Sequence, residues 1–398
     1  MKIVYLSNLY GAAARGGAER VVAAEAEALA ASGNQVVVIS LSSTGALEEE
    51  LVGAVSLIRF PAPNLYVYPD GHGRSWVIRL LWHLADIWNT PAAGRCQRFL
   101  LRESPDIVHT HNLMGLGFEI PTVIRRLGIG HVHTVHDVQL LHPSGLLAPD
   151  FEKRIGLGQR AYIAIMRRRM GSPDAVIFPS QALQDLHDHF GFFPGSNKII
   201  IPTPAPAVLL QPRAMPTKPS FLFVGQLEVH KGIRLLLETW SRWPGAKNSQ
   251  LAILGAGSLA EEVRAMAAPG IILAGPVDRD GVLAAMDRTA FLVVPSLVIE
   301  NSPSVIAESL SRGTPVIAAR VGGVPESVVE GRTGFLFEPG DAESLQSALG
   351  RAAAAMGDWR RYFENCCRAA GQRTPAKHVE ALERVYRELK NPAAARGQ

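Results

Sequence analysis

The sequence predicts an α/β protein whose domains are built on parallel sheets. Short apolar runs alternate with longer segments of helical spacing along most of the chain, which is typical of strand–helix–strand units. The length of 398 residues suggests two or three domains, and a hydrophobic content of 47% can supply a sizeable core for each. Six prolines fall between Ile201 and Ser220, so this stretch is the best candidate for a boundary between two halves.

The first half opens with a strand, a glycine turn and a helix. Ile3–Leu6 and Gln35–Leu41 are apolar runs, and the alanine-rich segment Ala18–Ser32 between them has helical spacing. Gly16 and Gly17 in the turn can bring backbone N–H groups close to a phosphate. An ordinary tight turn would use the same residues, so both interpretations stay open.

Two further strands of the first half end in histidines. The apolar runs Asp106–His109 and His131–Val135 predict strands, and His136 follows the second one directly. In a parallel sheet both strands deliver these residues to the same carboxyl edge. A histidine there can exchange protons near neutral pH, or it can serve as a structural residue of the core.

The second half repeats the alternation of strands and helices. Its apolar runs predict five buried strands: Phe221–Val224, Leu251–Leu254, Ile271–Val277, Phe291–Val294 and Thr314–Ala319. We therefore predict an N-terminal domain of residues 1–202, a proline-rich linker of residues 203–219, a second domain of residues 220–375 and a last helix at residues 376–390.

The segment Gly255–Ala260 fits the glycine fingerprint of dinucleotide-binding proteins, so an NAD-dependent enzyme is a rival interpretation. The fingerprint lies deep in the second half rather than at the start of a domain. The acidic residues about twenty positions later, Asp278 and Asp280, follow a Gly-Pro turn rather than a second strand. A short glycine turn in an α/β domain explains the segment as well.

The loop after the strand Phe291–Val294 carries the main candidate binding residues. Glu300 lies in this loop, and Glu308 lies on the following helical segment with seven residues between the two. Free backbone N–H groups at the start of that helix, together with the helix dipole, form an anion site. The residues expected there are Asn301, Ser302, Pro303, Ser304 and Val305. Each glutamate alone could equally be a solvated surface residue.

The stretch PSLVIENSPSVIAESLSRGTPVIAARVGGVPE, residues 295–326, resembles the glutamate-x7-glutamate signature of glycosyltransferase family four. The resemblance extends over most of the chain. It implies the GT-B fold, which is α/β with two Rossmann-like domains facing across a cleft and a last helix that returns to the first domain. It also implies a retaining transferase that uses a nucleotide-diphosphate sugar.

The resemblance assigns roles to residues of the second half. Glu308 would bind the ribose, Glu300 would contact the sugar, and Lys231 with the amides of residues 301–305 would bind the diphosphate. In the segment GQLEVHKG, Gln226 stands where the family usually has arginine, so it can donate a hydrogen bond but brings no charge. The backbone around Val277 would meet the nucleotide base.

In the first half, the resemblance concerns the segments GGAER and HTVHD. Gly16 and Gly17 of the first segment would touch the donor diphosphate or the acceptor. His136 of the second segment would reach the donor sugar. His136 and Glu300 are therefore the predicted catalytic residues.

We expect a glycosyltransferase of the hexosyltransferase class that moves a sugar from a UDP- or GDP-sugar to a hydroxyl acceptor in polysaccharide or glycolipid biosynthesis. The donor is a co-substrate, and neither a cofactor nor a metal ion is expected. Two alternatives stay open: a nucleotide-sugar epimerase of similar fold, and a non-catalytic binder of nucleotide sugars.

The composition of the chain limits which cellular compartment and which partners can be expected. A net charge of +4, from 40 basic and 36 acidic residues, is too mild to predict nucleic-acid binding. Three cysteines without metal spacing favour a reducing, cytoplasmic compartment, and no apolar stretch reaches the length of a membrane span. The partners expected are the donor and a saccharide or lipid-linked acceptor. Two basic, aromatic segments, Gly73–Arg102 and Lys153–Arg169, would suit either the inner face of a membrane or a core with a solvated basic face.

Overall fold

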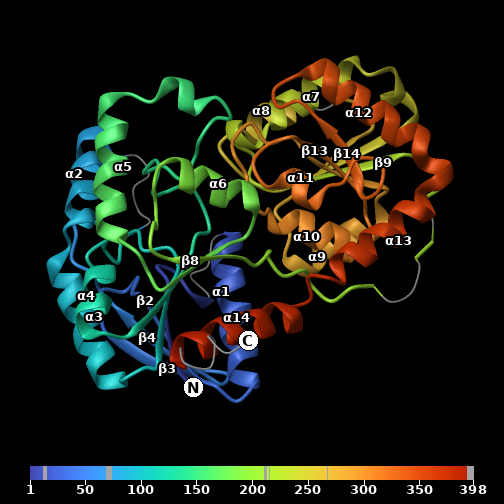
Figure 1. Ribbon diagram of the computed structural model, residues 1–398. Coiled ribbons are helices and arrows are strands. Elements are labelled where there is room, and N and C mark those ends of the chain that lie inside the picture. The colour runs from blue at the N-terminus through green and yellow to red at the C-terminus, as the bar shows by residue number, and fades with distance from the viewer. Residues whose placement is uncertain (12–15, 69–73, 210–212, 215, 267, 392–398) are drawn as a thin grey trace. The chain divides into compact units, whose positions relative to one another are not determined.

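The structure is a computed structural model of the chain that describes residues 1–11, 16–68, 74–209, 213–214, 216–266 and 268–391. The chain divides into two compact units, which are coloured by residue number in Figure 1. The first comprises Met1–Leu146, Ile155–Ile201 and the C-terminal segment from Pro375, and the second comprises Leu147–Arg154 and Pro202–Thr374. Gly73 and residues 210–212 and 215 of the expected linker lie outside the described residues.

One segment belongs to a different unit than the domain boundaries predicted from the sequence would give it. The short segment Leu147–Arg154 comes from the first half but belongs to the second unit. The N–H of Ile299 donates to the carbonyl oxygen of Leu147 at 2.8 Å, which ties this segment to the loop after a strand of the second unit.

The sheet of the first unit has the strand order β3-β4-β2-β1-β5-β6-β7-β8. Its strands are β1 (Lys2–Leu6), β2 (Gln35–Leu41), β3 (Glu48–Val52), β4 (Val55–Phe60), β5 (Ile107–Thr110), β6 (Gly130–Thr134), β7 (Ala175–Phe178) and β8 (Asn197–Ile200). Neighbouring strands are parallel except in the hairpin of β3 and β4. The order reverses between β1 and β5, so a ligand crevice is expected at the carboxyl ends of these strands.

Two helices that are far apart in sequence cover one face of this sheet. They are α1 (Gly17–Ala31) and α14 (Pro375–Lys390), drawn in blue and red in Figure 1. Val22 and Leu29 of α1 and Leu382 of α14 pack in one core cluster with residues of β1, β2 and β5. The other helices of the unit are α2 (Trp76–Ile87), α3 (Thr90–Glu103), α4 (Ile120–Leu127), α5 (Leu157–Met170) and α6 (Gln181–His189).

The second unit has an all-parallel sheet in the order β11-β10-β9-β12-β13-β14. Its strands are β9 (Ser220–Val224), β10 (Gln250–Leu254), β11 (Ile271–Gly275), β12 (Phe291–Val294), β13 (Val316–Ala319) and β14 (Gly334–Phe337). Numbered within the unit, the order is that of a Rossmann fold, and it reverses between β9 and β12. Buried apolar runs with helices on both sides favour such a parallel sheet.

Among the described residues, seven helices accompany the second sheet: α7 (Ile233–Arg242), α8 (Ala260–Ala265), α9 (Arg279–Arg288), α10 (Ser304–Ser311), α11 (Val324–Ser327), α12 (Ala342–Ala354) and α13 (Trp359–Ala370). Within the part of the chain that the structure describes, no helix combines the length and the apolar character that crossing a membrane requires.

Candidate functional site

The loop between β12 and α10 lies at the point where the second sheet reverses its strand order. The N–H of Gly323 donates to the carbonyl oxygen of Glu300 at 2.8 Å, and the N–H of Leu297 donates to that of His230 at 2.9 Å. Gly322 has a φ of +50°, and a Cβ atom there would lie 2.1 Å from the carbonyl oxygen of Glu300. Neighbouring backbone therefore fixes the loop on both sides.

The side chain of Glu300 is bound by two donors. Its Oε1 accepts hydrogen bonds from Lys231 Nζ at 2.7 Å and from Ser296 Oγ at 2.8 Å. The turn that carries Lys231 comes very close to the end of β12, because a Cβ atom on Gly232 would lie 1.8 Å from the carbonyl oxygen of Pro295. Only glycine permits this approach, and Gly232 also has a φ of +72°. The structure thus brings together two predicted site residues, Lys231 and Glu300.

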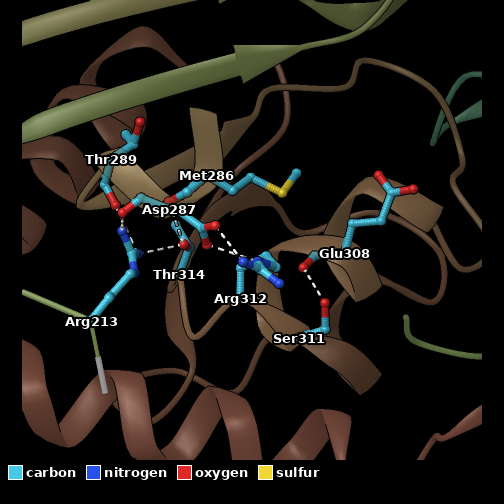
Figure 2. A network of polar contacts seen from close by, with 8 residues as sticks. All are labelled: Arg213, Met286, Asp287, Thr289, Glu308, Ser311, Arg312 and Thr314. Atoms are coloured by element: carbon cyan, nitrogen blue, oxygen red, sulfur yellow. Dashed lines mark hydrogen bonds and ion pairs between the residues drawn. The ribbon is translucent and has the colours of Figure 1, made fainter. Parts of the chain in front are cut away.

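Glu308 lies on the second turn of α10 and is buried, with 6% of its surface exposed. Its Oε1 lies 3.7 Å from Nε of Arg279, a half-exposed side chain at the start of α9. Figure 2 shows the carboxylate directed away from the polar network at the other end of α10, while its backbone carbonyl oxygen accepts from Ser311 Oγ at 2.7 Å. The carboxylate is therefore not a member of that network.

That network fixes the C-terminal end of α10 (Figure 2). Arg312 donates through Nε to Asp287 Oδ1 at 2.7 Å. Arg213, from the proline-rich segment, donates through Nη2 to Thr314 Oγ1 at 2.7 Å and to the carbonyl oxygen of Thr289 at 3.0 Å. Burial lowers the pKa of Arg213 to about 10. Sequence reasoning missed Arg213 because its acceptors lie more than seventy residues away.

Fewer backbone N–H groups are available at the start of α10 than the sequence suggested. Pro303 is the residue before the helix and carries no amide hydrogen, so of the expected residues it cannot donate. Ile306 N–H donates back to the carbonyl oxygen of Pro303 at 2.9 Å. The N–H groups of Ser304 and Val305 therefore precede the first helical hydrogen bond, and Asn301 and Ser302 lie half-buried just before them.

Gln226 is exposed in the loop after β9, and this loop packs on the glycine turn after β10. A Cβ atom on Gly255 would lie 1.8 Å from the carbonyl oxygen of Gly225, and one on Gly257 would lie 2.4 Å from that of Leu227. Close packing of two loops therefore explains the glycines of the dinucleotide fingerprint.

Val277 is exposed in the loop between β11 and α9. The next residues, Asp278 and Asp280, form an Asp-x-Asp pattern in a segment whose side chains are exposed. Asp278 Oδ1 accepts from the N–H of Gly281 at 2.9 Å, so this carboxylate caps α9. Arg279 connects the same loop to Glu308.

The glycine turn of the first unit leads into α1. Gly17 is the first residue of the helix, and the N–H of Gly16 donates to Glu19 Oε2 at 2.9 Å. A carboxylate of the chain itself thus occupies the positive helix end at Gly16. A phosphate bound by this amide would have to displace Glu19.

His136 follows β6 and pairs with a histidine that follows β5. Its Nε2 lies 2.8 Å from Nδ1 of His111, and the two rings are stacked with centroids 5.1 Å apart. Burial lowers the pKa of His136 to about 4 and that of His111 well below its ordinary value, so both rings are neutral near pH 7. Both line a small cavity of about 20 Å³ at the carboxyl ends of β5 and β6, which is room for one water molecule.

The two histidines of this pair have complementary tautomers. One of the facing nitrogens, Nδ1 of His111 or Nε2 of His136, carries a hydrogen that the other accepts. Nε2 of His111 is buried without a partner among the described residues.

A buried polar network lies below this pair. The hydroxyl of Tyr386, on α14, lies 2.6 Å from His109 Nδ1 and 2.9 Å from the hydroxyl of Tyr5. Tyr5 donates to Glu25 Oε2 at 3.2 Å, and Glu25 Oε1 lies 2.7 Å from Nε2 of His378.

Among the described residues, one group could offer several ligand atoms to a metal ion: Glu25, His109 and His111. Both nitrogens of His109 lie within hydrogen-bond distance of hydroxyl groups, those of Tyr386 and Thr134. Glu25 is engaged by Tyr5 and His378. Most of the possible ligand atoms of this group are thus already engaged by hydrogen-bond partners within the protein.

Two family models match the chain. Residues 15–206 match "Glycosyltransferase Family 4", and residues 218–354 match "Glycosyl transferases group 1". A relative, the phosphatidyl-myo-inositol mannosyltransferase of Mycobacterium leprae (strain TN), is 28% identical over 353 residues, with 84% of this chain and 83% of the relative covered.

Solved structures share the fold across nearly the whole chain. Sucrose-phosphate synthase from Thermosynechococcus elongatus has a TM-score of 0.76 at 20% identity, covering 98% of this chain and 100% of the other. Anabaena Alr3699/HepE in complex with UDP-glucose has a TM-score of 0.68 at 16% identity, covering 97% and 99%.

The two parallel sheets and these neighbours define a glycosyltransferase of the GT-B fold. Within that class, the chain belongs to glycosyltransferase family four, as the glutamate loop predicted. The fold class and the family predicted from the sequence are confirmed. Because both matched models describe glycosyltransferases, the epimerase alternative is not favoured.

Proposed function

We propose that the protein is a retaining glycosyltransferase of the hexosyltransferase class that transfers a sugar from a UDP- or GDP-sugar to a hydroxyl acceptor in polysaccharide or glycolipid biosynthesis. The observation that carries this proposal is the group formed by Lys231, Glu300 and the start of α10 beside buried Glu308, at the strand-order reversal of the second sheet. The complex of the structural neighbour with UDP-glucose supports a nucleotide-sugar donor. The name of the relative, a phosphatidyl-myo-inositol mannosyltransferase, supports a lipid-linked acceptor.

The donor diphosphate would bind where positive charge and free amides meet. Lys231 and the N–H groups of Ser304 and Val305 would stabilise the negative charge that develops on the leaving diphosphate. Glu308 would accept hydrogen bonds from the ribose, and Val277 would lie near the base. Glu300 already holds Lys231 and would release it in part to contact the sugar.

In the reaction, the bond between the anomeric carbon and the diphosphate breaks and a bond to the acceptor oxygen forms. A phosphate oxygen of the leaving group accepts the proton of the acceptor, so no separate base is needed. The reaction as proposed uses no metal ion and no cofactor. His136 is the residue of the first unit proposed to contact the donor sugar.

Calorimetric titration of the full chain with UDP and with GDP tests this proposal. The tighter nucleotide identifies the base, and Glu308→Ala should bind it at least tenfold more weakly because the ribose loses a buried acceptor. Glu338→Ala, which removes an exposed carboxylate of the same unit, is the matched control and should bind normally. Unchanged affinity of Glu308→Ala would contradict the assigned ribose site, and loss of binding in the presence of EDTA would contradict metal independence.

A further inference from the structure

The ring of His111 lies between His136 and the interior of the first unit. Its Nδ1 is 2.8 Å from Nε2 of His136, which is a hydrogen-bond distance. His111 is 1% exposed and adjoins a cavity of about 20 Å³, which is too small for a sugar. His136 is half-buried at the carboxyl edge of the sheet. An effect of His111 on a sugar substrate must therefore pass through His136.

The backbone of His111 is fixed by the first sheet. Its N–H donates to the carbonyl oxygen of Leu6 on β1 at 2.8 Å, in continuation of the pairing between β1 and β5. Successive side chains of a strand point to opposite faces of a sheet, so His109 and His111 share one face. The sheet rather than a loop therefore sets where the His111 ring begins.

Two aromatic rings hold the His111 ring from the inner side. The centre of the His109 ring lies 4.2 Å from that of His111, and the centre of the Tyr5 ring lies 4.7 Å from it. His109 is itself fixed, because both of its nitrogens lie within hydrogen-bond distance of hydroxyl groups, one of them that of Tyr386 on α14. The ring that faces His136 thus belongs to a packed and hydrogen-bonded core.

The hydrogen bond between the two histidines also selects a tautomer. Because burial lowers the pKa values of both rings, each is neutral near pH 7 and carries one ring hydrogen. One facing nitrogen donates and the other accepts. The pairing therefore fixes whether Nε2 of His136 carries the hydrogen, and with it whether Nδ1 of His136 donates or accepts.

We propose that His111 is a positioning residue for sugar transfer, which holds the ring of His136 in one orientation and in one tautomer. This inference rests on the proposed contact of His136 with the donor sugar. Without the hydrogen bond, the ring of His136 is free to turn and to exchange between its neutral tautomers. A misplacement of about 1 Å can cost roughly a hundredfold in rate, so the pairing acts on the chemical step rather than on donor affinity.

Two variants separate the hydrogen bond from ring packing. His111→Phe keeps an aromatic ring but removes Nδ1, whereas His111→Asn places an amide near the position of Nδ1 but removes the ring. Hydrolysis of UDP-glucose and of GDP-mannose by the full chain, without an acceptor, gives kcat and KM for the donor that is turned over. His111→Phe should lower kcat by roughly tenfold or more and leave KM within about threefold, and His111→Asn should restore most of the lost kcat.

Nitrogen-15 spectra of the histidine rings give a readout that does not depend on activity. Near pH 7, His136 should show one neutral tautomer in the unaltered chain and in His111→Asn, and a mixture of both in His111→Phe. His187→Phe is the matched control, because it replaces another buried histidine of the first unit, on α6. It should leave kcat and the His136 spectrum unchanged, whatever it does to stability.

Three results would overturn the inference. They are a kcat of His111→Phe at the unaltered level, equal losses of kcat in both His111 variants, and a mixture of His136 tautomers in the unaltered chain. The last measurement needs no variant, so it decides even if a variant does not fold. A chain that binds UDP or GDP but hydrolyses neither donor would contradict the proposed function instead, and the spectra would still show whether His111 holds the ring of His136.

Discussion

At the scale of single residues, Gly232 decides where Lys231 lies. It combines a left-handed backbone with a position at which any side chain would collide with the end of β12. The prediction concerns Gly232→Ala, which should weaken nucleotide binding at least tenfold, because relieving the collision moves Lys231 away from Glu300. Calorimetry with the preferred nucleotide measures this.

Gly331→Ala is the matched control for this variant. Gly331 has a φ of +69°, close to that of Gly232, but a Cβ atom there would meet no atom within 4 Å. Both variants should lose about 1–3 kcal/mol of unfolding free energy from backbone strain. If both lose nucleotide affinity equally, strain rather than the placement of Lys231 explains the effect.

At the scale of elements, α14 is attached to the first sheet by buried polar contacts as well as by apolar packing. Tyr386 lies at the centre of these contacts, within hydrogen-bond distance of His109 and Tyr5. Tyr386→Phe should lower the free energy of unfolding by about 1–3 kcal/mol, because two buried polar groups lose a partner. Chemical denaturation measures this loss.

Tyr10→Phe is the internal comparison for that experiment. Tyr10 is also buried in the first unit, but its hydroxyl makes no hydrogen bond among the described residues. Removing it should leave stability unchanged or slightly improved, since no partner is lost. A loss as large as that of Tyr386→Phe would show that ring packing rather than the hydroxyl matters.

The sequence predicted the elements better than their contacts. Apolar runs located the strands around the site, because a strand of a parallel sheet is buried on both faces. Helix α4 begins only at Ile120, because Gly115 and Gly117 shortly before it have positive φ values that a helix does not accept.

The site was predictable where its parts are close in sequence and not elsewhere. The loop from Glu300 to Glu308 is one segment, so the two glutamates and the residues around them could indicate a candidate binding site. The hydrogen bond of Arg213 to Thr314 and the pairing of His136 with His111 depend on residues that the fold brings together.

At the scale of the whole molecule, buried titratable groups make stability depend on pH. Burial depresses the pKa values of eight histidines of the first unit: to about 3 for His131, to about 4 for His136 and His187, well below the ordinary value for His109, His111 and His133, and below it for His83 and His142. The unfolded chain binds more protons than the folded chain below pH 6.5, so these groups remove stability as the pH falls from about 6.5 to about 4. Asp86 and Asp137, whose pKa values burial raises to about 7, act in the opposite direction over the same range.

Because the histidines outnumber the aspartates, the net effect is loss of stability in acid. Denaturation at pH 7, 6 and 5 should give a falling free energy of unfolding, and the loss should concern the first unit, where all these groups lie. His189→Asn, which replaces an exposed histidine, should leave the profile unchanged. A stability that stays constant or rises between pH 7 and pH 5 would contradict this account.

The return of α14 to the first unit has a consequence for biosynthesis. A ribosome delivers residues 1–201 long before Pro375–Lys390, and the N-terminal sheet lacks Tyr386 and His378 throughout that interval. The second unit consists of Leu147–Arg154, which is made early, and of the continuous segment Pro202–Thr374, so it can mature first. The nascent chain therefore completes its later half before its earlier one, and a premature stop codon shortly before residue 375 would spare the second unit while leaving the first unit incomplete.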